Sequence, residues 1–210
     1  MNYLKFKKKV EKFPIISSAQ LVFLEKDAQI LRNQLSRWEK RGLIIKLRKG
    51  LYILNESDRK IEPSKIFLAN QLYSPSYVST EYALGFYDLI PERVVDVTSV
   101  STRKTYKIKN IFGEFVYQHI TPKAFKGFTF VKDENDCNVL IATPEKAIVD
   151  FIYLNLSRFR EDDLNMFEES YRFQNIEKLR KNAIGEFASY FNNRKLIKIV
   201  KNFCQFMEEK

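Results

Sequence analysis

The sequence contains few of the residues that build metal centres and disulfides. Its 210 residues include two cysteines, Cys137 and Cys204, and one histidine, His119. The cysteines are far apart and lack CxxC spacing, so they indicate neither a disulfide framework nor a zinc site. One histidine cannot form a cluster of imidazole ligands. We therefore expect structural thiols, a structural or surface histidine, and no cofactor.

Long apolar runs are also missing. Apolar runs such as residues 43–45 and 147–149 are far shorter than the roughly 20 residues that a membrane-spanning helix needs. Residues 1–9 are basic, but they lack the apolar stretch and the small-residue cleavage site of a secretion signal. The sequence therefore predicts a cytoplasmic protein with no membrane association.

The short signatures of common enzymes are absent as well. The sequence has no GxxxxGK[ST] phosphate loop, no GxGxxG fingerprint and no HExxH motif. We interpret the acids at 161–163 as favourable charges at a helix start, and those at 133–136 as a solvated hairpin tip. The chain is thus not expected to be an enzyme. The alternative is a nucleic-acid-modifying enzyme with a winged-helix targeting domain, which two carboxylates converging in a polar cleft of the second region would favour.

Positive charge, in contrast, is concentrated at one end of the chain. Residues 1–60 contain ten Lys and five Arg against six Asp and Glu, a net charge of +9. Residues 61–210 contain 21 basic against 20 acidic residues, a net charge of +1. A local basic excess of this kind is typical of a polyanion-binding module joined to a neutral domain. We therefore expect a DNA-binding domain over 1–60 and a second domain over 61–210.

The pattern of residues 1–60 predicts a winged helix-turn-helix. Apolar spacing, capping residues and the stop at Gly42 define the helices, and β-branched runs around Gly50 define a hairpin. Lys26 is expected in the turn before the third helix. The predicted order is a first helix over 3–12, a short second helix from about residue 19, a third helix capped by Asp27 and running to about Arg41, and strands over 43–47 and 50–54.

The third helix and the hairpin supply the candidate DNA-binding residues. An apolar stripe of Ala28, Leu31, Leu35 and Trp38 is expected to pack inward. In a winged helix the third helix enters the major groove of double-stranded DNA, and the hairpin lies on the backbone or the adjacent minor groove. The base-reading candidates are Gln29, Arg32, Asn33 and Ser36. The phosphate-binding candidates are Arg37, Lys40, Lys46, Arg48 and Lys49.

Two alternatives to these assignments stay open. Any one of the candidate side chains can be an ordinary solvated group with no ligand. A winged helix can also serve protein contacts, although such a domain does not need a local charge of +9. The base-reading assignments rest on chemistry, because arginine can bond guanine in bidentate fashion and asparagine matches adenine.

The second region predicts a mixed α+β domain of antiparallel tendency with a helical tail. Residues 55–63 are polar and suit a linker. Ser64, Ser79 and Thr143 are expected to begin helices. Strands are predicted over 94–100, 112–120, 127–131 and 138–141, and two or three helices follow from about residue 160. The fold class is therefore α+β, with an N-terminal winged helix-turn-helix.

Four stretches of the chain resemble one known family. They are Trp38 to Ile44 (WEKRGLI), Arg48 to Tyr52 (RKGLY), Tyr77 to Leu84 (YVSTEYAL) and Ile141 to Asp150 (IATPEKAIVD). The sequence resembles the AbiEi antitoxins of type IV toxin-antitoxin systems, which are linked to abortive phage infection, from about residue 17 to about residue 156. The resemblance implies a transcriptional regulator that binds an operator, expected to hold inverted repeats, and represses its own operon. It also implies neutralisation of a nucleotidyltransferase-like toxin encoded nearby, without stable direct contact.

Overall fold

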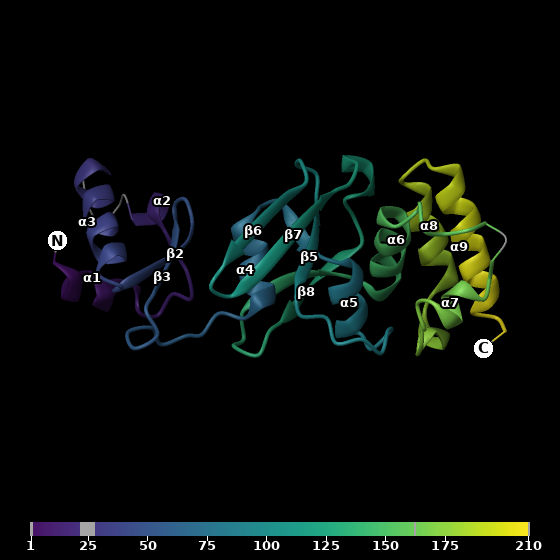
Figure 1. Cartoon of the computed structure of the whole chain (residues 1–210), viewed down its shortest axis with the longest axis horizontal. Helices are drawn as coiled ribbons and strands as arrows, with labels where there is room; N and C mark the ends of the chain where they lie inside the picture. Colours follow the sequence, from purple (N-terminus) through teal and green to yellow (C-terminus); the bar gives the residue numbers. More distant parts are fainter. Residues whose placement is uncertain (1, 22–27, 162, 210) are drawn as a thin grey trace.

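The computed structural model describes residues 2–21, 28–161 and 163–209. The chain forms an N-terminal lobe, a central sheet with its helices, and a C-terminal group of helices, in that order along its long axis (Figure 1). The fold is α+β, and its main sheet mixes parallel and antiparallel pairs.

The N-terminal lobe contains three helices and a three-stranded antiparallel sheet in the order β1-β3-β2. The predicted helices and hairpin are present, and β1 is an addition that the sequence did not indicate. Lys26 and Asp27, which were assigned to the turn and the cap before the third helix, lie outside the described residues. The elements are α1 (Tyr3–Val10), β1 (Ile16–Ser17), α2 (Ser18–Leu21), α3 (Ala28–Lys40), β2 (Ile44–Arg48) and β3 (Leu51–Leu54).

Gly42 ends α3 as expected. Its φ of +68° lies in the left-handed region, which costs glycine little because it has no Cβ. The next residue, Leu43, donates its backbone N–H to the Trp38 carbonyl at 2.9 Å, so the last turn of the helix is closed. The chain then enters β2 directly, and the hairpin is held next to α3.

The main sheet has six strands in the order β6-β7-β5-β4-β9-β8 (Figure 1). The pairs β4 with β9 and β5 with β7 are parallel, so the expected antiparallel tendency holds for the other pairs only. Strands β4 and β6 were not predicted. The strands are β4 (Ser76–Val78), β5 (Val97–Ser101), β6 (Tyr106–Asn110), β7 (Gly113–His119), β8 (Phe128–Lys132) and β9 (Asn138–Ala142).

The helices of this region begin largely where capping residues predicted. The Ser64 hydroxyl accepts the Phe67 N–H at 3.1 Å, and the Thr143 hydroxyl accepts the Lys146 N–H at 3.4 Å. Ser79 precedes a helix, but its hydroxyl makes no capping bond. The helices are α4 (Lys65–Leu72), α5 (Thr80–Phe86), α6 (Pro144–Leu154), α7 (Met166–Glu169), α8 (Lys181–Ser189) and α9 (Arg194–Phe206), with short 3-10 turns at Pro122–Ala124 and Ile176–Lys178.

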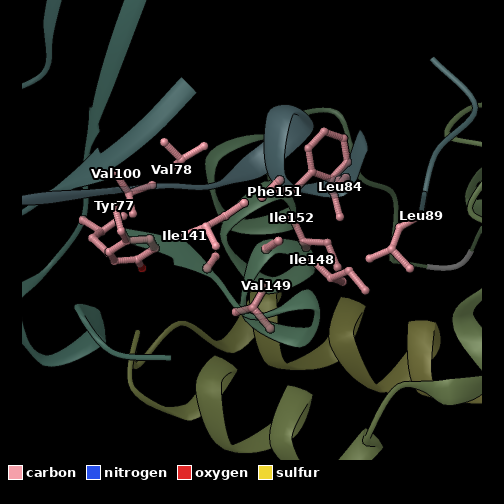
Figure 2. Close-up of a cluster of buried hydrophobic side chains, with 14 of the residues drawn as sticks. Tyr77, Val78, Leu84, Leu89, Val100, Ile141, Ile148, Val149, Phe151 and Ile152 are labelled. Atoms are coloured by element: carbon pink, nitrogen blue, oxygen red, sulfur yellow. The ribbon is translucent and has the colours of Figure 1, made fainter. Parts of the chain in front are cut away.

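Helix α6 lies at the centre of the main core. Figure 2 shows Ile148 and Ile152 of α6 beside Leu84 and Leu89, while Ile141 lies between α6 and the strands. These side chains are at most 2% exposed. The apolar face of α6 is therefore buried in the main core.

The same helix buries a charged pair. Lys146 and Asp150 are both 0% exposed, and the Lys146 Nζ donates to the Asp150 Oδ1. The Asp150 Oδ2 accepts the Tyr77 hydroxyl at 3.0 Å and the Ser79 hydroxyl at 2.8 Å. Burial raises the pKa of Asp150 and lowers the pKa of Lys146, and their mutual attraction opposes both shifts. The Ser79 hydroxyl thus bonds this carboxylate and makes no capping bond to α5.

We expect the free energy of unfolding to fall by about 3–5 kcal/mol in Lys146→Met, because the Asp150 charge is left buried without its cation. The double variant Lys146→Met/Asp150→Asn should recover most of this loss, since the amide oxygen can still accept the two hydroxyl bonds. Urea unfolding measures the effect. Lys107→Met is the matched control. The Lys107 side chain pairs with Glu114 and is itself 61% exposed, so its removal should lower the free energy of unfolding by about 1 kcal/mol or less. A loss in Lys146→Met no larger than in the control contradicts the prediction.

The β2–β3 hairpin contributes to two cores. Ile44 and Leu54 pack with α1 and α3 in the core of the N-terminal lobe. Leu47 and Ile53, which are 3% and 1% exposed, belong instead to the core of the main sheet. A register shift between Lys46 and Arg48 lies at this point of β2. The hairpin therefore joins the N-terminal lobe to the rest of the chain by apolar packing as well as by the linker.

Leu47→Ala and Ile53→Ala should each lower the free energy of unfolding of the full chain by roughly 2–5 kcal/mol, the usual cost of emptying a packed core position. Thermal and urea unfolding measure it. Leu4→Ala serves as the control, because Leu4 is 68% exposed on α1 and should change stability by less than about 0.5 kcal/mol. If both hairpin variants match the control, the two lobes do not share this packing.

Candidate nucleic-acid interface

Helix α3 has one buried and one exposed face. Leu31, Leu35 and Trp38 are 2%, 1% and 6% exposed, so the predicted apolar stripe is confirmed at these positions. The side chain of Ala28, the fourth member, lies outside the described part of the chain. Trp38 packs on Phe6 of α1 with 4.6 Å between ring centroids. This contact fixes which face of α3 points away from the core.

All the predicted DNA-binding residues of α3 lie on the exposed side. Successive helical residues are about 100° apart, so positions 29, 33, 36 and 40 form one strip opposite the buried stripe. Arg32 and Arg37 lie on the two flanks of that strip. The exposed residues are Gln29, Arg32, Asn33, Ser36, Arg37 and Lys40.

Two amides of the strip are bonded to each other. The Gln29 Nε2 donates to the Asn33 Oδ1 at 3.1 Å, one helical turn apart. An adenine read by Asn33 would need that oxygen as the acceptor for its amino group. Base reading at this position therefore requires the Gln29 amide to move or to share the oxygen.

The hairpin tip is tied to the start of α2. Gly50 has a φ of +84°, and its carbonyl accepts the Ser18 N–H at 2.9 Å. A Cβ at position 50 would lie 3.2 Å from the Ser18 Oγ, so a side chain there would be both strained and crowded. The prediction of a glycine turn is confirmed. Lys46, Arg48 and Lys49 are exposed on this hairpin.

Arg32 and Lys49 border one hollow. It has a volume of about 400 Å³ and lies between α3, α2 and the hairpin. Arg37 and Lys40 border a different hollow of about 550 Å³, beside Tyr3 and the start of α1. These four cationic residues therefore form two groups: Arg32 with Lys49 beside one flank of α3, and Arg37, on the other flank, with Lys40 at the end of the exposed strip.

Arg48 belongs to neither group. Burial raises the pKa of Tyr117 in β7, and the positive charge of Arg48 acts to lower it. Strand β2, which carries Arg48, approaches β6 at the edge of the main sheet. Arg32 and Lys49 border the same hollow, whereas Arg48, whose guanidinium donates to the Lys49 carbonyl at 3.4 Å, does not border it.

In the second region, the Asp133 carboxylate is bonded to neighbouring backbone and side-chain groups. Asp133 accepts the backbone N–H groups of Asn135 and Cys137 at 3.0 and 2.8 Å, and the Ser64 hydroxyl at 2.6 Å. Asp133 and Glu134 border a hollow of about 410 Å³, but the bonds of Asp133 organise the turn. Within the described residues, no group of three or more His, Cys, Asp and Glu side chains could hold a metal ion.

The other residues noted in the sequence have ordinary environments. His119 is exposed, with its Nδ1 3.0 Å from the Arg103 carbonyl, which agrees with a surface histidine. Cys137 and Cys204 are free thiols. Glu161 pairs with Lys198 at 2.8 Å, and its neighbour Asp162 lies outside the described residues.

The sequence reasoning missed the buried group formed by Lys146, Asp150, Tyr77 and Ser79. A signal for it was present. Lys146 and Asp150 are four residues apart: Lys146 directly precedes the run from Ala147 to Ile152, and Asp150 is its one charged residue. Charged residues on the buried face of a helix need partners.

In the parts of the chain that the structure covers, every helix is too short or too polar to cross a membrane. Comparison with protein-family models gives no match for this chain, and comparison with curated proteins gives none either.

Proposed function

We propose that this chain is a cytoplasmic DNA-binding transcriptional repressor whose N-terminal lobe acts as a winged helix-turn-helix. The observation that carries the proposal is the exposed polar strip of α3, which lies opposite the Trp38 stripe and beside a basic hairpin. Such a helix can enter the major groove while the hairpin contacts the backbone. The net charge of +9 on residues 1–60 favours phosphate binding.

Within this interface we assign different roles to different groups. Arg32, Asn33, Gln29 and Ser36 face outward near the N-terminal part of α3, where recognition helices contact base edges. Lys49 and Lys46 lie on the hairpin, Arg37 lies on the second flank of α3, and Lys40 lies at the end of the exposed strip. Their charges suit phosphates of the double-stranded operator, which we expect to hold inverted repeats. No cofactor is needed for this role.

We further propose that the chain is the antitoxin of a type IV toxin-antitoxin system. The support is the resemblance to the AbiEi family, whose stretches at 77–84 and 141–150 lie in the second region. In the structure both stretches contribute to the Asp150 group, so they stabilise one core that is separate from the α3 strip. The repressor would then control its own operon, and the second region would counter a nucleotidyltransferase-like toxin without stable contact.

Base reading and phosphate binding should respond differently to mutation. Arg32→Ala or Asn33→Ala should reduce discrimination between operator and unrelated DNA by roughly 1–3 kcal/mol at particular base pairs. Lys49→Ala should weaken both DNAs alike and lower the salt slope by about one unit. Titrations at several salt concentrations measure both quantities. Lys201→Ala, an exposed lysine of α9, is the control and should change neither. If Lys49→Ala loses as much specificity as Arg32→Ala and Asn33→Ala, then α3 does not lie in the major groove.

Mutation of the DNA-binding residues should abolish promoter repression without abolishing neutralisation of the toxin. The triple variant Arg32→Ala, Arg37→Ala, Lys49→Ala should lose repression of its own promoter, because it removes cations from both flanks of α3. It should still rescue growth when the neighbouring toxin is expressed from an independent promoter, since the main core is untouched. The measurements are a promoter reporter and a growth assay, with Lys201→Ala as control and circular dichroism to verify folding. A folded triple variant that fails to rescue would refute the division of roles and leave repression as the better account.

A further inference from the structure

The hollow between α2, α3 and the hairpin combines an apolar floor with a cationic rim. Leu31 and Leu35 of α3 border it, although they are only 2% and 1% exposed, so its floor is the core of the N-terminal lobe. Ala19 of α2 and Tyr52 of β3 are further parts of its lining. Its volume of about 400 Å³ is that of a small-molecule site, and such sites are mostly apolar with a few polar groups.

The rim of this hollow carries two cations and no acid. The exposed side chains of Arg32 and Lys49 border it from α3 and from the hairpin, and neither forms an ion pair within the described residues. Glu39 adds to the burial that raises the pKa of Tyr52, but it does not border the hollow. Because a guanidinium presents parallel N–H groups that match a carboxylate, an acid group is the natural partner for this rim.

We propose that the hollow binds a small aromatic carboxylate, with the ring on Leu31 and Leu35 and the carboxylate between Arg32 and Lys49. A small inorganic anion leaves the apolar floor uncovered, and a neutral aromatic molecule leaves both cations without a counter-charge. An aromatic acid meets both requirements in one molecule. The aromatic side chain of Tyr52 in the lining favours a ring over an aliphatic chain.

Arg32 and Lys49 are also proposed DNA contacts, so the regulatory consequence of this site rests on the proposed function. A carboxylate bound between them neutralises charge that DNA binding needs. The ligand and operator DNA therefore compete for one flank of α3, and the ligand acts as an inducer that releases the repressor. Binding of the ligand to the free chain does not depend on DNA.

Benzoate is the probe for this site, and benzamide and acetate are its controls. Benzamide keeps the ring without the charge, and acetate keeps the charge without the ring. Each compound is titrated into the full chain at constant ionic strength, up to about 20 mM because so small a ligand binds weakly. NMR chemical shifts of the protein measure binding. We expect benzoate to bind about tenfold or more tightly than either control.

Two substitutions change the hollow without touching its buried floor. Ala19→Leu, at an exposed position of α2, should fill part of the hollow, and Lys49→Ala removes one of the two cations. Each should weaken benzoate binding by about tenfold or more. The matched controls are Ala19→Ser, which leaves the hollow open, and Lys8→Ala, which removes an exposed cation of α1 that does not border the hollow. Both controls should bind benzoate as the parent chain does, and thermal unfolding verifies that each variant is folded.

Operator DNA is then titrated into the full chain with benzoate at about ten times its dissociation constant, where competition should raise the apparent dissociation constant of the DNA about tenfold. Acetate at the same concentration should cause no such rise, and benzoate should cause none in Ala19→Leu. A chain that binds benzoate but no DNA refutes the proposed function and leaves the ligand site supported. Benzoate that binds without weakening DNA binding overturns the competition. Benzoate that binds no more tightly than benzamide or acetate overturns the ligand site, and so does binding that survives both Ala19→Leu and Lys49→Ala.

Discussion

Asp150 loses all of its hydration on folding, and the arrangement of the main core follows from how that loss is offset. Its two oxygens accept bonds from Lys146, Tyr77 and Ser79, which come from α6, β4 and the start of α5. A shift of any of these elements would leave a buried charge without a partner, at a cost of several kcal/mol. The Lys146 Nζ also lies 4.5 Å from the Phe191 ring centroid, so the C-terminal helices are placed against the same group. Apolar packing alone would allow α6 more freedom.

The hairpin extends this constraint to the N-terminal lobe. Its Ile44 and Leu54 face α1 and α3, while Leu47 and Ile53 face the main core. A hairpin with two apolar sides cannot turn freely about the linker at 55–63. The proposed DNA-contacting residue Lys49 is therefore positioned by both cores, whereas charge counting alone suggested a self-contained basic module. Any change in the main core can reach the hairpin through Leu47 and Ile53, which gives the proposed repressor a physical path between its two regions.

Local signals in the sequence predicted the helices well and the sheet only in part. The Ser64 and Thr143 hydroxyls accept N–H groups of the helices that they precede, as the local pattern predicts. Ser79 has the same local pattern, but its hydroxyl donates to the buried Asp150, a contact across 71 positions of the chain, and makes no capping bond. Strand β4 spans only Ser76–Val78, too short for an alternating pattern to be recognised. Strand β6 has one buried residue, Ile108, and its lysines and Tyr106 give no alternating apolar pattern.

The exposed face of α3 was predictable because Leu31, Leu35 and Trp38 define its opposite side.

The split of the basic residues into two groups fits the proposed docking better than a single patch would. A helix with its side chains is about 10–12 Å across, close to the width of roughly 12 Å of the major groove. Its two flanks then face opposite walls of the groove, which belong to different DNA strands. Arg32 and Lys49 lie on one flank of α3, and Arg37 lies on the other. Cations on both flanks can therefore hold the exposed strip of α3 against the base edges from two sides.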